Sequence, residues 1–182
     1  MSGDEDIKLT PRESVETFLQ VYKELMAEKN FNGYDKPLIE QVRLVDAHPN
    51  GVTWELDVTE YWTNMNGVMH GGAYGVIFDM CTAIAMNPIS KADYWDFLAG
   101  VSRTINISYL KAIPLGTTIR IKCEVIQHGR RMALIRGVME SVDGKTVYAT
   151  VEHHKTALPS KPEYAKRLRE ARAQRMREKS KI

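Results

Sequence analysis

The sequence predicts a single α+β domain in which one long apolar helix packs against an antiparallel sheet. The segment 73–86 is apolar on nearly every side, so a helix there should be buried. Six strand-like segments flank it, two before and four after, and most are joined by short turn-forming links. The 182 residues contain no internal repeat and no second apolar core. This combination is typical of an α+β sandwich.

Composition excludes several classes of protein. Apolar residues make up 43% and charged residues 26%, as in ordinary globular chains, and the net charge of +2 gives little attraction to nucleic acid or membranes. The start is acidic and lacks a signal-peptide core, and no stretch approaches the roughly 20 apolar residues that span a bilayer. With Cys81 and Cys123 in apolar runs, we expect an intracellular, cytoplasmic protein that binds neither nucleic acid nor membrane.

A helical extension, 1–36, is predicted to precede the main domain. Thr10-Pro11-Arg12-Glu13 forms a capping box with proline at the first helical position. Apolar residues then recur at helical spacing to about Ala27: Val15, Phe18, Leu19, Tyr22, Leu25 and Met26. A turn-rich connector, 30–36, should follow.

The main domain, 37–157, should begin with two strands, 38–45 and 52–58, joined by a turn at 46–51. A polar and aromatic loop, 60–66, leads into the apolar helix, which Pro88 stops. Four strands are then predicted as an antiparallel meander with an Asp-Gly turn before the last one: 98–109, 117–127, 132–142 and 146–155. The remaining residues, 158–182, read as a basic helical tail whose charges face solvent; nucleic-acid binding is the alternative, but interleaved aromatics are missing.

Asp79 is the most informative residue, because a carboxylate in an apolar helix is costly to remove from water unless it is paired or hydrogen-bonded. A role in capping a loop or meeting a lysine is the structural alternative to catalysis. His70-Gly71-Gly72 marks the start of the same helix, where free N–H groups can stabilise a negative oxygen. The alternative for both glycines is close packing of the helix on the sheet.

Helix geometry separates these two features. Asp79 follows Gly71 by eight residues, which is roughly 12 Å along one helix. The two groups of one chain therefore cannot hold the same small carbonyl. If both are catalytic, the site combines two chains, and the protein works as an oligomer.

The composite of Asn64-Met65-Asn66-Gly67-Val68-Met69-His70-Gly71-Gly72, then Asp79, then 101–109 resembles the PaaI-type hotdog thioesterases. It is most similar to the mammalian acyl-CoA thioesterases of that group. The resemblance covers about residues 38–156 and implies a hotdog fold, a long buried helix wrapped by a curved antiparallel sheet, with extra N- and C-terminal helices. It also implies a homodimer or a homotetramer built as a dimer of dimers.

The resemblance implies roles for individual residues. Asp79 would be the general base toward water, or the nucleophile. Gly71 N–H would bind the thioester oxygen, Asn64 would orient the carbonyl or the water, and Ser102 would help to hold that water. His70 would shape the loop and contact substrate. A further set would contact coenzyme A: Thr104, Tyr109, Gln127, His128, Gly129, Arg130, Arg131, Met132 and Lys155.

These roles predict hydrolysis of an acyl-CoA thioester with no cofactor and no metal, since one carboxylate, a positioned water and an oxyanion donor suffice. His153-His154 is no metal site, because adjacent strand residues point to opposite faces. The alternatives are a non-catalytic acyl-CoA-binding module and an enoyl-thioester hydratase. Arg130 and Arg131 suit phosphate, although a solvated turn explains them equally.

Two further signals stay open. The loop 87–96 is more aromatic and acidic than the family pattern, so either it lines the acyl pocket or it is a surface loop. The terminal Ser180-Lys181-Ile182 resembles a peroxisomal signal of the Ser-Lys-Leu type, and the alternative is chance occurrence in a basic tail.

Overall fold

The computed structural model describes residues 8–97 and 100–181. Twelve elements follow one another in the described chain: α1 (Pro11–Glu28), α2 (Asp35–Gln41), β1 (Arg43–His48), β2 (Gly51–Asp57), the 3₁₀ turn η1 (Glu60–Trp62), α3 (Gly71–Ile84), the 3₁₀ turn η2 (Asn87–Ile89), β3 (Val101–Tyr109), β4 (Thr118–His128), β5 (Met132–Ser141), β6 (Val147–Thr156) and α4 (Pro162–Lys179).

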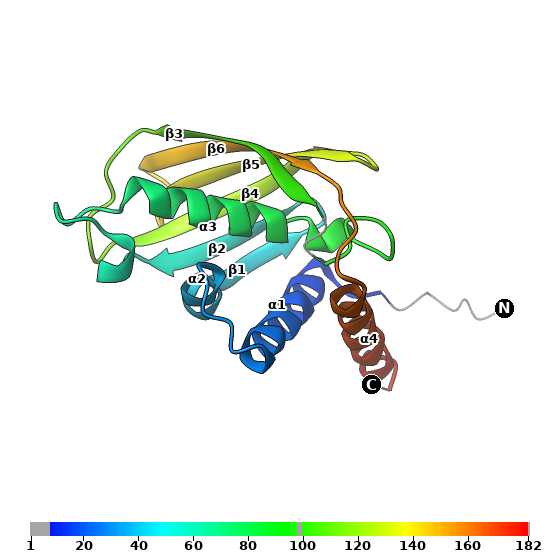
Figure 1. Cartoon of the computed structure of the whole chain (residues 1–182). Coiled ribbons are helices and arrows are strands. Elements are labelled where there is room, and N and C mark those ends of the chain that lie inside the picture. Colours follow the sequence, from blue (N-terminus) through cyan, green and yellow to red (C-terminus); the bar gives the residue numbers. More distant parts are fainter. Residues whose placement is uncertain (1–7, 98–99, 182) are drawn as a thin grey trace.

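The six strands form one antiparallel sheet in the order β1-β2-β4-β5-β6-β3. The central helix α3 lies across one face of this sheet, and the terminal helices lie together beside it (Figure 1). The predicted fold class is confirmed: a helix packed on a curved antiparallel sheet, with extra helices at both ends.

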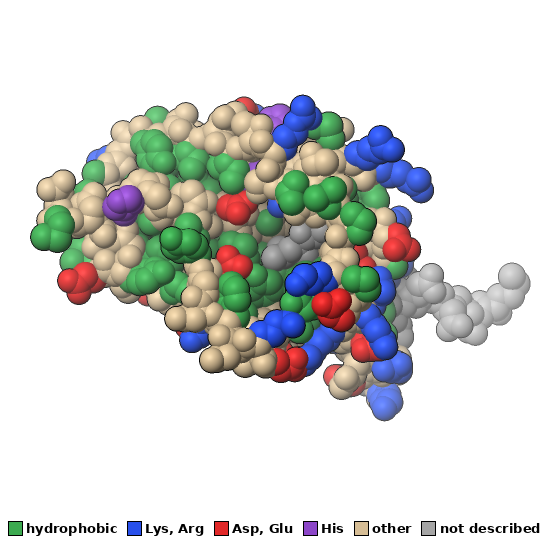
Figure 2. Space-filling view, viewed as in Figure 1, with side chains coloured by type: hydrophobic (Ala, Val, Ile, Leu, Met, Phe, Trp, Pro, Cys, Tyr) green, Lys and Arg blue, Asp and Glu red, His purple; other side chains and the backbone are tan. Residues whose placement is uncertain are grey.

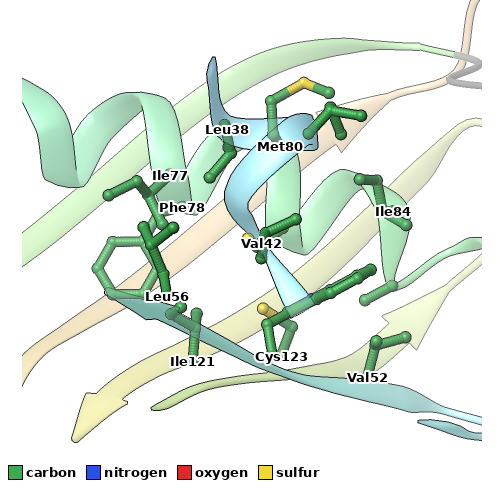
Figure 3. Close-up of a cluster of buried hydrophobic side chains, with 14 of the residues drawn as sticks. Leu38, Val42, Val52, Leu56, Ile77, Phe78, Met80, Ile84, Ile121 and Cys123 are labelled. Carbon is green, nitrogen blue, oxygen red and sulfur yellow. The ribbon is translucent and has the colours of Figure 1, made fainter. Parts of the chain in front are cut away.

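The core lies between α3 and the sheet (Figure 3). Phe78 of α3 is fully buried, and a Cβ at Gly137 of β5 would stand 3.0 Å from its ring and 2.6 Å from Val151. Gly137 therefore lets the ring lie directly on the strand. Buried side chains of α2, α3, β2 and β4 complete this part of the core: Leu38, Val42, Ile77, Ile84, Val52, Leu56, Ile121 and Cys123.

The predicted connector 30–36 and strand 38–45 were wrong in part, because Asp35–Gln41 is a helix. Leu38 and Ile39 are buried at 0% and 1% exposure, and Val42 just after the helix at 9%. These three positions fall on one face of a helix, and that face covers the core. The strand β1 begins only at Arg43.

The predicted four-strand meander was also wrong in its first link. The strands β4, β5 and β6 form a meander, but β3 pairs with β6 at the sheet edge and not with β4. The connection from β3 to β4 passes beneath the start of α3, where Ile113 is fully buried and Leu115 N–H donates to Gly67 O at 2.9 Å. The predicted start of this strand, 98–99, lies outside the described residues.

The N-terminal helix begins as expected. Thr10 caps α1, its side chain accepting from Glu13 N–H while the Glu13 carboxylate accepts from Thr10 N–H. Each bond satisfies an N–H group that the first turn of a helix otherwise leaves unpaired. The capping box is thus confirmed.

The basic tail is a helix, α4, and the expectation that its charges face solvent was wrong only in part, because Lys166 and Glu170 form the expected exposed pair at 3.8 Å. Leu168 and Ala165 are buried, and α4 lies alongside α1 (Figure 1). Basic and acidic side chains alternate over this helix pair (Figure 2). Ion pairs join the two helices: Arg167 with Glu24 and Glu28, Arg175 with Glu16, and Lys179 with Glu13. Sequence spacing could not reveal these partners, which lie about 140 or more residues earlier.

Candidate active site

The site is built on the face of α3 that the sheet leaves uncovered. Gly71, Gly75 and Asp79 recur every four residues and so lie near one line along the helix. The Asp79 side chain is 44% exposed, so the expectation that it lies out of water is not met in the single chain. The opposite face is buried against the sheet through Tyr74, Ile77, Phe78, Cys81 and Ile84.

Three side chains connect Asp79 to the protein interior. Ser102 Oγ donates to Asp79 Oδ1 at 2.6 Å, and His153 Nε2 lies 2.9 Å from Ser102 Oγ and 3.6 Å from Asp79 Oδ1. On its other side, His153 Nδ1 lies 2.6 Å from Thr82 Oγ1. The four groups form one chain of contacts from the core to the open carboxylate.

The positions of the protons in this chain follow from counting donors. An ionised carboxylate only accepts, so Ser102 spends its single proton on Asp79. His153 Nε2 must then carry a proton and donate it to Ser102, and in a neutral ring Nδ1 is left as an acceptor that faces Thr82 Oγ1, whose single proton also has Phe78 O as an acceptor at 2.5 Å. The donors of Ser102 and His153 Nε2 therefore both point toward Asp79.

His153 is neutral in this arrangement because burial lowers its pKa to about 4; Lys155 adds to the effect and Asp79 opposes it. The His153 side chain is fully buried. A neutral imidazole can hold Ser102 without competing with Asp79 for its proton.

Lys155 stands in register with Ser102 across the pairing of β3 and β6. It is only 4% exposed, and burial lowers the pKa of its ammonium while Asp79 opposes that shift. Its predicted contact with coenzyme A stays a prediction, since little of its surface is open in the single chain.

The start of α3 gathers a second group of predicted residues. Asn64, His70 and Gly71 line one surface hollow of about 860 Å³, together with Glu60, Thr63, Met65, Asn66, Gly67 and Leu115. His70 is the N-cap of the helix, and its Nδ1 accepts from Gly72 N–H at 2.9 Å. His70 therefore shapes the helix start, and its contact with substrate stays a prediction.

The backbone N–H groups of Gly71 and Gly72 differ in their hydrogen-bond acceptors. Within the part of the chain that the structure describes, no acceptor bonds the Gly71 N–H, whereas its carbonyl accepts from Tyr109 OH at 3.1 Å. A Cβ at Gly71 would meet nothing within 4 Å, and one at Gly72 would meet only the His70 ring. Packing on the sheet, the alternative reading of these glycines, is therefore wrong.

The structure thus forms two half-sites in one chain. It brings Ser102 to Asp79, and it brings Asn64 and His70 to Gly71. Asp79 does not line the hollow at the helix start, and the eight-residue separation predicted from the sequence stands. The groups that would act on one carbonyl lie at different points of α3.

Comparisons with known proteins agree with this geometry. A family model described as the thioesterase superfamily matches residues 66–148. Acyl-coenzyme A thioesterase 13 of Mus musculus is 30% identical over 101 residues, which cover 56% of this chain and 68% of the relative. The chain belongs to the thioesterase superfamily. It is a thioester hydrolase with a hotdog fold.

Further relatives of this thioesterase show the same relationship. Human acyl-coenzyme A thioesterase 13 is 29% identical over 114 residues, covering 63% of this chain and 75% of the relative. The crystal structure of zebrafish thioesterase superfamily member 2 has a TM-score of 0.66 at 27% identity, covering 83% of this chain and all of that one. A structure of the phenylacetic acid degradation protein PaaI from Thermus thermophilus, at 18% identity, covers 67% of this chain and 99% of that one; its TM-score of 0.57 shows the fold alone.

Apart from Lys155 on β6, the residues of the thioesterase predicted to contact coenzyme A lie on one strand and one hairpin. Thr104 and Tyr109 lie on the exposed edge strand β3, and 127–132 forms the hairpin between β4 and β5. Figure 2 shows lysine and arginine side chains at the end of the sheet that carries this hairpin. Arg130 also lines a hollow of about 460 Å³ with Trp95, Leu158 and Arg169.

The loop after α3 in the thioesterase is not a free surface loop. Tyr94 OH lies 2.5 Å from His128 Nδ1, and Trp95 Nε1 donates to Gly129 O at 2.9 Å. Asp93, Trp95 and Phe97 have φ of 60°, 52° and 53°, a left-handed conformation that is strained for large side chains. These contacts tie the loop to the hairpin.

His153 is the functional candidate that sequence reasoning missed. The pair His153-His154 was weighed only as a metal site and set aside. The available signal was the alternation of β6, which turns His153 into the core and leaves His154 half-buried. Among the described residues, no cluster of three or more His, Cys, Asp or Glu could hold a metal, and no helix there is long and apolar enough to cross a bilayer.

Proposed function

We propose that the protein is an acyl-CoA thioesterase in which Asp79 of one subunit directs water onto a thioester whose oxygen is held by the start of α3 of a second subunit. The observation that carries the proposal is the open carboxylate of Asp79, held at 2.6 Å by Ser102 and backed by a neutral buried histidine. A carboxylate fixed by one oxygen keeps the other free to accept a proton from water.

Each residue has a defined task in this mechanism. Ser102 fixes Asp79 with its proton and keeps one lone pair on Oγ for the attacking water. Asp79 takes the proton as water attacks, which makes it the general base; the C–S bond then breaks, and the leaving coenzyme A thiolate takes that proton. Direct attack by the Asp79 carboxylate is the alternative. Gly71 N–H and the Asn64 amide stabilise the oxyanion that develops. No metal or cofactor takes part.

A second subunit is required because the half-sites lie apart in one chain. The edge strand β3 supports a homodimer, since its nine residues leave one row of backbone groups unpaired in the single chain. Val101 and Tyr109 on this strand are 51% and 57% exposed, and Leu110 just after it is 59% exposed. Pairing of two β3 strands would cover these groups and bring two α3 helices together.

Coenzyme A is the favoured thiol. The mouse and human relatives are acyl-coenzyme A thioesterases, and a thioesterase protein from Streptococcus pneumoniae, 19% identical to this chain, has been crystallised with coenzyme A. Arg130 and Arg131 in the exposed hairpin suit its phosphate groups.

The test is a thiol-release assay with a panel of acyl-CoAs on wild-type protein and on Asp79→Ala. We expect thiol release by the wild type and a loss of kcat of at least 10²-fold in the variant, with oligomer and ligand binding retained. Wild-type turnover by Asp79→Ala would remove the assignment. Hydration of an enoyl-CoA without thiol release would instead identify a hydratase.

Subunit mixing tests the shared site. Asn64→Ala and Asp79→Ala should each be nearly inactive alone, but hybrid dimers contain one site with neither substitution. We expect each hybrid dimer to regain up to half of the activity of a wild-type dimer, because one of its two sites is intact. No recovery, despite subunit exchange demonstrated by mass spectrometry, would refute the shared site.

A further inference from the structure

The C-terminal end of α3 is capped from outside the helix. The last carbonyls of a helix need partners, and a positive charge there favours the helix dipole. The last turn of α3 contains no basic residue. Asn87, which is 1% exposed, instead folds back and donates from Nδ2 to Ile84 O at 3.1 Å.

Arg172 of α4 holds Asn87 in that position. Its Nη2 lies 3.1 Å from Asn87 Oδ1 and 3.3 Å from Asn87 O, so the guanidinium donates to both the side-chain and the backbone oxygen of the capping residue. It also donates to Ser90 Oγ at 2.9 Å, to Ser90 O at 3.2 Å and to Ser14 Oγ at 3.1 Å. Ser14 of α1 in turn donates to Asn87 O at 3.0 Å.

The charge of Arg172 is not used in an ion pair. Within residues 8–97 and 100–181, no carboxylate oxygen lies within 4.0 Å of its guanidinium, in contrast to Arg167, Arg169 and Arg175 on the same helix. Burial lowers the pKa of Arg172, and Asp96 opposes the shift. A buried cation bonded to neutral acceptors beside a helix C-terminus is stabilised by that helix.

We propose that Arg172 is a positioning residue: through Asn87 it caps α3 from a second helix and thereby fixes the axial position of Asp79. The ion pairs of Arg167 with Glu24 and Glu28 and of Lys179 with Glu13 hold α4 against α1 beside this contact. Because Gly71 lies on the same helix, one displacement of α3 would disturb both half-sites. The kinetic part of this inference rests on the proposed thioesterase mechanism, whereas the structural part does not.

The kinetic test compares Arg172→Ala with Arg175→Ala in the full-length protein, at a temperature where circular dichroism shows both folded. Arg175 is the matched control, because it bonds Glu16 and Thr17 of α1 and makes no contact with Asn87. We expect Arg172→Ala to lose about 10- to 100-fold in kcat with KM nearly unchanged, since small displacements of reacting groups have effects of this size. Arg175→Ala should stay within about twofold of wild type.

Chemical rescue separates positioning from general packing. Guanidinium chloride at low millimolar concentration should restore kcat of Arg172→Ala at least threefold, because the ion can occupy the vacated site. Sodium chloride at equal concentration should not. Arg172→Lys, which keeps the charge but not the fork of donors, should lie between Ala and wild type.

Hydrogen exchange provides a readout independent of activity. Peptides that cover residues 80–90 should exchange faster in Arg172→Ala and in Asn87→Ala than in wild type or Arg175→Ala. The double variant should lose no more kcat than the worse single variant, because both act through one relay. Equal kcat loss in Arg172→Ala and Arg175→Ala, or unchanged exchange at the end of α3, would overturn the proposal. If wild type releases no thiol at all, the proposed function fails, and the exchange result still decides this inference.

Discussion

Lowering the pH should destabilise the protein through His153. Its pKa in the folded chain is about 4, because burial disfavours the charged ring, whereas an unfolded histidine titrates near 6.5. Between these values the unfolded chain binds a proton that the native chain does not. Stability is therefore lost as the pH falls below about 6.5, and the loss levels off below about 4.

The size of the effect follows from the shift. At 1.36 kcal/mol per pKa unit, the difference between 6.5 and about 4 corresponds to about 3 kcal/mol, of which about 2 kcal/mol is lost between pH 7 and pH 5. The groups that face His153 are Asp79, Ser102, Thr82 and Lys155. Protonation would make Nδ1 a donor to Thr82 Oγ1, whereas Nε2–H would still donate to Ser102.

The assay is urea unfolding at pH 7, 6 and 5 and at fixed protein concentration, since an oligomer's stability depends on concentration. His153→Gln should remove about 2 kcal/mol of the pH dependence, whereas His154→Gln on the outer side of the same strand should keep it. An unchanged pH dependence in His153→Gln would refute the burial argument.

Three further predictions test other parts of the structure. Ser102→Ala should lower kcat by about 10- to 10²-fold without lowering Tm by more than a few degrees, as measured by thiol release and calorimetry, because it removes the hydrogen bond that fixes Asp79 and the acceptor of His153 Nε2–H but leaves the apolar core intact. Gly137→Ala should destabilise by about 1–3 kcal/mol in urea titrations, because the new Cβ would stand 2.6 Å from Val151 and 3.0 Å from Phe78; a neutral effect would show that the strand yields. A Cβ added by Gly75→Ala would meet nothing within 4 Å in the single chain, but it would stand between two α3 helices that approach each other at this face. We therefore expect weaker self-association in sedimentation experiments, and stronger association would contradict the proposed approach of a second α3.

The features predictable from the sequence were those set by local chemistry. The capping box of Thr10 and Glu13 and the apolar helix 73–86 each depend on residues a few positions apart. The role of Ser102 beside Asp79 came from a family pattern and not from spacing. The structure brings the two residues, 23 positions apart, to a hydrogen bond of 2.6 Å, and the role of Ser102 in holding water stays a prediction.

The features that could not be predicted depend on distant partners. Whether Leu38 and Ile39 continue a strand or turn into a helix depends on the surface that α3 offers them. The place of β3 beside β6 depends on how the chain crosses beneath Gly67, which no turn motif encodes. The charges of α4 are matched by α1, and a helical charge pattern does not identify a partner from the other end of the chain.

The two faces of the central helix α3 require different kinds of residue. The sheet side must be large and apolar, as Ile77, Phe78 and Ile84 are, to hold the helix on the core. The open side has glycine at 71, 72 and 75, although exposed glycine in a helix is less stable than alanine by about 1 kcal/mol per residue. Among residues 8–97 and 100–181, no atom lies within 4 Å of a Cβ added at Gly71 or Gly75, so packing inside the chain does not require glycine at these two positions. Glycine at these positions is explained if the helix backbone must approach a group outside the chain. A thioester oxygen bound at the Gly71 N–H and a second helix packed against Gly75 would each require such a close approach.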